Sequence, residues 1–68
     1  MQLYRFLTGP DSSEFCHRVT DALNKGWALH GSPCHHYNAD EKKMYCGQAV
    51  TKTVEGHDYT PDIKLGSF

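Results

Sequence analysis

The first part of the chain shows two hydrophobic patterns, and each predicts a different element. Residues 2–8, QLYRFLT, are rich in aromatic and aliphatic side chains and end at Gly9-Pro10, which is typical of a strand. The next apolar positions recur at the spacing of one helix face, namely Phe15, Val19, Ala22 and Leu23. The pattern therefore predicts a strand over residues 2–8 and an amphipathic helix over residues 12–25.

Both ends of this helix carry residues suited to helix ends. Asp11 or Ser12 can accept hydrogen bonds from the free amides of the first turn, and Glu14 follows Asp11 at the spacing of a capping box. Gly26 can take the left-handed conformation that closes a last turn. Trp27 comes next, and a Trp buries roughly 200 Å² of surface. We therefore expect Trp27, at the seam between helix and strand, to be the centre of the core.

Two further strands follow, joined by polar residues. The second runs from Trp27 to Pro33 or Cys34, because Pro33 cannot donate a hydrogen bond to a ladder. The third covers residues 43–52, and residues 38–41 between them form a turn. Small side chains on one face of the third strand, Gly47 and Ala49, suggest that the helix approaches that face.

These elements predict an α+β fold of strand-helix-strand-strand order. One amphipathic helix packs on a three-stranded sheet, in which the second and third strands form an antiparallel hairpin. Residues 1–52 are expected to be a single small domain, and residues 53–68 a mobile or weakly docked C-terminal tail. The predicted core is one face of the third strand together with Phe6 or Leu7, Phe15, Val19, Leu23, Trp27 and Leu29.

Length and charge narrow the class of protein. A chain of 68 residues makes one domain, and a net charge of −1 with thinly spread Lys and Arg argues against nucleic-acid and membrane partners. No apolar run approaches the roughly 20 residues that span a bilayer, and the first residues do not resemble a secretory signal. An odd set of three cysteines indicates free thiols. We therefore expect a cytoplasmic protein.

Three short motifs stand at fixed points of this order: Tyr4, Gly26-Trp27-x-Leu29-x-Gly31 and Gln48-Ala49-Val50. At these residues the chain resembles a family of short bacterial proteins catalogued as domain of unknown function 1737. The resemblance covers residues 2–52. It implies a compact α+β fold, and it implies no activity, cofactor or site residue.

The candidate chemistry is a set of thiol and imidazole groups in and near the predicted hairpin. Zn²⁺ prefers these ligands in tetrahedral sites, and the candidates are Cys34, His36, Cys46 and His30. A small zinc-binding domain that uses the Cys34, His35 and His36 region is therefore one functional hypothesis. Against it, the chain lacks the paired C-x-x-C spacing of recognisable zinc sites.

The pairs Cys16-His17 and Cys34-His35 raise the question of nucleophilic catalysis. Neighbours along a helix or strand point in different directions, and no motif places an acidic partner to orient a base. We therefore expect no enzyme, no catalytic residue and no cofactor.

The remaining class is interaction. A three-stranded sheet covered by one helix leaves one face and at least one edge open, and open edges pair with other chains. The sequence thus favours a non-catalytic interaction or accessory module, as a homodimer or with a protein partner at an open sheet edge or face, over the zinc alternative.

Overall fold

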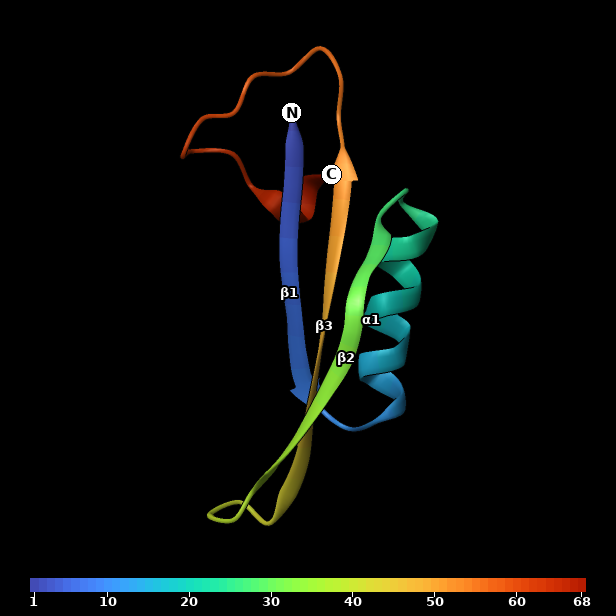
Figure 1. The fold of residues 1–68 in the computed structure, drawn as a ribbon, viewed down its shortest axis with the longest axis vertical. Helices are drawn as coiled ribbons and strands as arrows, with labels where there is room; N and C mark the ends of the chain where they lie inside the picture. The colour runs from blue at the N-terminus through green and yellow to red at the C-terminus, as the bar shows by residue number, and fades with distance from the viewer.

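A sheet of three antiparallel strands with one helix on one of its faces makes up the fold (Figure 1). The computed structural model describes residues 1–68. In it, β1 spans Gln2–Pro10, α1 Ser13–Asn24, β2 Ala28–Asn38 and β3 Lys43–Thr53. This is the α+β class and element order that the sequence predicts, and β2 and β3 form the expected antiparallel hairpin.

The last strand of the chain, β3, lies at the centre of the sheet, in the order β1-β3-β2. Both neighbours run antiparallel to β3. The two edge strands, β1 and β2, therefore point in the same direction on either side of it. The last pair between β1 and β3 is Pro10 with Tyr45, and the hairpin continues beyond it without a third strand (Figure 1). The molecule is therefore elongated, with extents of 44 × 23 × 19 Å.

The C-terminal end of α1 closes as the sequence predicts. Gly26 has a φ of +96°, its amide donates to the Leu23 carbonyl oxygen at 3.2 Å, and the Trp27 amide donates to that of Ala22 at 3.0 Å. These two bonds form a Schellman motif, in which the buried side chains of Trp27 and Ala22 belong to one apolar cluster. The cap thus ends the helix and also delivers Trp27 into the core.

The N-terminal end of α1 is simpler than expected. Ser12 is the N-cap residue and is extended, with φ −150° and ψ 169°. No side-chain hydrogen bond caps this end, so the predicted capping box of Asp11 and Glu14 does not form. Asp11 is held instead through its backbone amide, which donates to the Met44 carbonyl oxygen at 2.9 Å.

Replacing Gly26 with alanine is expected to destabilise the protein by about 1 kcal/mol, because an L-residue pays roughly 1–2 kcal/mol for the left-handed region. A urea titration followed by circular dichroism measures the change. Gly66→Ala is the matched control, since Gly66 does not have a positive φ and has nothing within 4 Å of an added methyl group. Equal stability of the two variants would show that the cap does not need a glycine.

The buried cluster joins α1 to β1, β3 and the residue before β2. Its members are Leu3, Leu7, Ala22, Trp27 and Val50. Trp27, with 3% of its surface exposed, and Leu7 confirm the prediction. Phe15 and Val19 are partly buried and pack against the cluster.

Two residues predicted for the core, Leu23 and Leu29, are exposed instead. Of the alternatives Phe6 and Leu7, Leu7 is buried and Phe6 is exposed on the opposite face. Leu23 is one residue, or about 100° around the helix, from Ala22, which faces the sheet. Leu29 pairs with Val50 on the helix side, but β2 is an edge strand and 54% of Leu29 stays exposed. It lines an open groove of about 270 Å³ between α1 and β2.

The expected approach of the helix to Gly47 and Ala49 is wrong. Cys46 and Val50 are on the helix side of β3, so the alternating small residues lie on the opposite face. There the Phe6 ring covers Gly47: a Cβ added at Gly47 would lie 2.6 Å from Phe6 Cζ and 3.1 Å from Cys34 Sγ. The small residue accommodates an aromatic ring, and not the helix.

The tail returns to the helix side of the sheet. Met1 and Val54 extend the ladder by exchanging two main-chain hydrogen bonds, and η1 spans Leu65–Ser67. Lys52 Nζ donates to the carbonyl oxygens of Lys25 and Phe68, both at 2.6 Å. One ammonium group thus joins the end of α1, β3 and the tail. The domain boundary at residue 52 stays a prediction.

Candidate functional site

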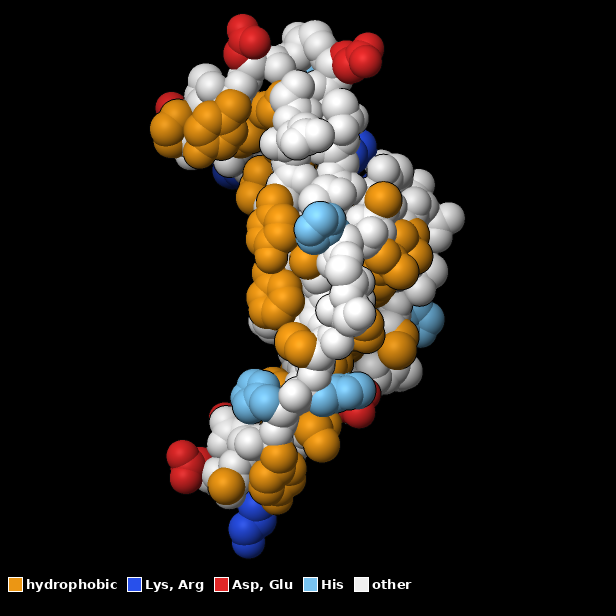
Figure 2. Space-filling view, viewed as in Figure 1, with side chains coloured by type: hydrophobic (Ala, Val, Ile, Leu, Met, Phe, Trp, Pro, Cys, Tyr) orange, Lys and Arg blue, Asp and Glu red, His pale blue; other side chains and the backbone are white.

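The face of the sheet that α1 does not cover carries exposed aromatic side chains. Tyr4 and Phe6 of β1 are 56% and 51% exposed, and we call this pair the aromatic ridge. The alternation of β1 places both rings on the face opposite the buried Leu3 and Leu7. Figure 2 shows hydrophobic side chains in a row along β1, beside a histidine, with no acidic or basic side chain among them.

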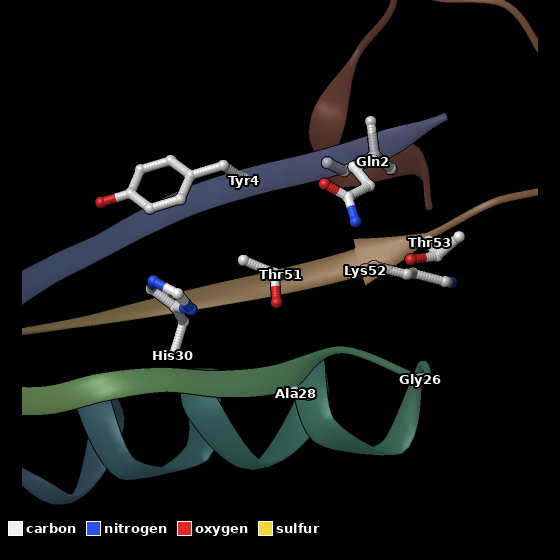
Figure 3. Close-up of a pocket in the computed structure, with 9 residues that line it drawn as sticks. Gln2, Tyr4, Gly26, Ala28, His30, Thr51, Lys52 and Thr53 are labelled. Atoms are coloured by element: carbon white, nitrogen blue, oxygen red, sulfur yellow. The ribbon is translucent and has the colours of Figure 1, made fainter.

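Beside the ridge the sheet surface is hollow. A depression of about 540 Å³ lies next to Tyr4, and we call the side chains of Ala28, His30, Thr51 and Thr53 within it the sheet trough. Figure 3 shows Tyr4, Thr51 and His30 from the three strands on this same face. The ridge and the trough together form one continuous surface, high along β1 and low over β2 and β3.

The trough residues are uncharged, and the ammonium group of Lys52, which borders the depression, donates to the carbonyl oxygens of Lys25 and Phe68. From Tyr45 to Thr53, the β3 residues that alternate onto this face are tyrosine, glycine, alanine and two threonines. The β2 residues opposite them are Ala28, His30, Cys34 and His36. The strands therefore present apolar and hydrogen-bonding side chains on this face, and no Lys, Arg, Asp or Glu.

A different group of side chains meets on the helix side, at the far end of β1. The possible ligand atoms of Asp11, His35 and Cys46 all lie within 4.8 Å of one another. His35 Nε2 is 3.7 Å from Asp11 Oδ2, and both side chains are about half exposed. Cys46 is buried, and its thiol lies 3.6 Å from the Gly9 carbonyl oxygen.

Three elements position this cluster. His35 of β2 is the cross-strand partner of Cys46 of β3, and Gly9 of β1 is the partner of Cys46 on its other side. Asp11 follows β1 directly, and its amide bond to Met44 fixes it beside β3. The cluster therefore rests on the central strand of the sheet and not on a free loop.

Of the four zinc ligands suggested by the sequence, only Cys46 belongs to this cluster. Cys34 pairs with Gly47, His36 with Tyr45 and His30 with Ala49, so these three side chains lie on the open face. Cys46 lies on the helix side, in contact range of His35 and Asp11. The His36 ring stacks on Tyr45, with ring centroids 5.7 Å apart. Metal binding by the set proposed from the sequence stays a prediction.

The pKa values of two side chains, Cys46 and Tyr45, are raised by their surroundings. Burial raises the pKa of the Cys46 thiol, and the carboxylate of Asp11 raises it further. The pKa of Tyr45 is also raised, chiefly because its phenol donates a hydrogen bond to Glu41 Oε2. At neutral pH Cys46 is therefore a protonated, poorly nucleophilic thiol.

His35 and Cys46 are both among the thiol and imidazole groups that the sequence indicated, but their direct pairing and the nearby Asp11 were not predicted. The signal was the hairpin turn: once Asn38 and Lys43 are paired across it, counting back places His35 opposite Cys46. Asn38 confirms the turn, because its Oδ1 accepts hydrogen bonds from the amides of Asp40 and Glu41. Asp11 could be placed only once β1 was known to lie beside β3.

Gln48 is a buried polar residue whose position explains its place in the Gln-Ala motif. Its Nε2 donates to the carbonyl oxygens of His30 at 3.4 Å and Gly31 at 3.3 Å. These carbonyls lie at an irregularity of β2, where the register shifts between His30 and Cys34 and Gly31 has a φ of +72°. The side chain thus replaces ladder hydrogen bonds that the bulge removes.

Comparison with known proteins identifies one family. No helix in the structure is both long and apolar enough to cross a membrane. Neither the curated proteins nor the solved structures include a match to the chain. The family model for the domain of unknown function DUF1737 matches residues 1–53, which hold the whole sheet and its helix. The chain therefore belongs to the DUF1737 family.

Proposed function

We propose that the protein is a non-catalytic interaction module of the cytoplasm, and that it associates with a second copy of itself through the open face of its sheet. The observation that carries the proposal is the aromatic ridge, two large rings more than half exposed on a face onto which the strands place no Lys, Arg, Asp or Glu. Three free thiols support a reducing compartment.

Exposure of the ridge favours an interface. Single exposed apolar residues are common, but neighbouring aromatic rings on a flat surface are typical of contact sites. Tyrosine suits such a site, because its ring buries apolar area while its hydroxyl group keeps a hydrogen-bond partner. Phe6 is also held in place, since its ring rests on Gly47. A preordered ring loses little conformational freedom on binding.

The shape and charge of the face favour a second copy as the partner. A twofold axis parallel to the strands, midway between the two sheets, brings the ridge of each copy over the trough of the other, which makes a self-complementary contact. The two faces meet without like-charge repulsion between strand residues, because the strands place no Lys, Arg, Asp or Glu on this face. A nucleic acid or an anionic membrane would instead require a cationic surface.

The size of the face sets the expected strength of the dimer. Three strands of about eight residues span roughly 14 by 26 Å at ordinary strand spacing and rise. A contact of this size is at or below the low end of the range for stable interfaces, which bury about 800 Å² on each partner. We therefore expect a weak dimer with a micromolar dissociation constant.

Sedimentation equilibrium at tens of micromolar tests the proposal. The wild-type protein should be mainly dimeric, and Tyr4→Arg should be monomeric, because a guanidinium group from each copy would be buried without a charged partner in the trough of the other. Tyr59→Arg is the matched control: Tyr59 is 66% exposed but lies in the tail, outside the strands of the sheet.

Two results would contradict the proposal. One is a wild-type protein that stays monomeric at several hundred micromolar. The other is a dimer that persists in Tyr4→Arg, which would place the contact elsewhere, for example along the hydrogen-bonding edge of a strand. Thermal unfolding of both arginine variants checks that loss of the dimer does not reflect loss of the fold.

A further inference from the structure

We propose that Asp11, His35 and Cys46 form a zinc site that ties the start of the helix to the sheet. This differs from the set suggested by the sequence, because Asp11 is a new ligand and Cys34, His36 and His30 take no part. The site is also independent of the open face, since it lies on the helix side of β3.

The separations fit a four-coordinate ion. Zinc bonds of 2.0–2.3 Å in a tetrahedron place the ligand atoms about 3.3–3.8 Å apart. His35 Nε2 and Asp11 Oδ2 are already 3.7 Å apart, and all three ligand atoms lie within 4.8 Å. The remaining difference is about 1 Å. Small rotations of the half-exposed Asp11 and His35 side chains can close it while Cys46 stays fixed in the sheet.

The donor set selects the class of metal. One thiolate, one imidazole and one carboxylate suit Zn²⁺, whereas Mg²⁺ and Ca²⁺ require oxygen ligands. Cys46 would bind as thiolate and release its proton to the solvent. Three protein ligands leave the fourth position to water, as in open zinc sites. That position faces the solvent between the exposed Asp11 and His35.

The topology gives such an ion a mechanical role. Its ligands would come from three segments: the connection before α1, β2 and β3. These segments lie together at the end of the sheet where β1 stops. Small domains commonly need a staple to supplement a limited core. A metal that binds only the folded state raises its stability according to its concentration relative to the dissociation constant.

Cobalt titration of the reduced full-length chain tests the site, because Co²⁺ occupies zinc sites and reports its ligands spectroscopically. The wild-type protein should take up one equivalent, with a sulfur-to-cobalt charge-transfer band in the near ultraviolet and tetrahedral bands in the visible. Zn²⁺ should displace the cobalt and raise the unfolding temperature. Both spectral signals should disappear in His35→Ala and in Cys46→Ala.

The matched controls are Cys34→Ala and His36→Ala, which remove a thiol and an imidazole one residue away on the opposite face. Both should retain the full cobalt spectrum. His35 and Asp11 are exposed, so His35→Ala and Asp11→Asn should fold even if Cys46→Ala does not. The proposal is overturned if the wild-type protein shows no sulfur charge-transfer band at millimolar Co²⁺. It is equally overturned if the band survives His35→Ala and is lost in Cys34→Ala.

Discussion

Replacing Trp27 with alanine is expected to leave the protein unfolded at room temperature. Trp27 is 3% exposed and packs within the buried cluster, and the Arg5 guanidinium group lies over its ring at 5.7 Å from the centroid. Truncating a buried Trp costs about 3–5 kcal/mol. A core this small supplies about the same amount of stability in total. Far-ultraviolet circular dichroism during a thermal scan measures the result.

The control for this variant is Tyr59→Ala, which removes an aromatic ring that is 66% exposed. It should change the free energy of unfolding by no more than about 0.5 kcal/mol. A cooperative transition above about 45 °C in Trp27→Ala, within the ordinary range of small domains, would show that the core does not depend on this side chain.

Cys46 is expected to react with iodoacetamide at roughly one-hundredth of the rate of Cys16 and Cys34, or more slowly. Cys16 and Cys34 are exposed, whereas Cys46 is buried in the central strand. Its reaction must wait for the fold to open, and a stability of about 3–5 kcal/mol keeps the open fraction below one part in a hundred. The raised pKa of the Cys46 thiol lowers the thiolate population further.

Mass spectrometry after timed pulses of reagent gives the three rates. In denaturant all three thiols should react alike, which serves as the internal control. If Cys46 is modified as fast as Cys34 under native conditions, then the end of the sheet near Gly9 and Cys46 is open in solution, and the geometry of the proposed metal site would not hold there.

Local signals in the sequence were enough to predict the type and order of the elements, although β2 continues through Pro33 to Asn38, beyond the end predicted at Pro33 or Cys34. The apolar spacing from Phe15 to Leu23 and the glycine after Lys25 specify α1 and its C-terminal cap without knowledge of the rest. The polar turn at residues 38–41 likewise specifies the hairpin. These features depend on neighbours within a few positions, which is the range over which a sequence pattern carries information.

Features that depend on which strands are neighbours could not be predicted in the same way. The exposure of Leu29 follows from the edge position of β2, which the alternation of its side chains does not reveal. The contact of Phe6 with Gly47 needs the register of β1 on β3. For the same reason, Asp11 could not be placed beside His35 and Cys46 before the strand order was known.

The central position of β3 has a consequence for how the chain is made. β1 and β2 do not pair with each other, and both pair with the strand that emerges last from the ribosome. The helix can form early, because its hydrogen bonds are local. No ladder of the native sheet can assemble until residues 43–53 are synthesised. The β2-β3 hairpin, whose partners are close in sequence, can then pair first, and β1 joins β3 across a much longer loop.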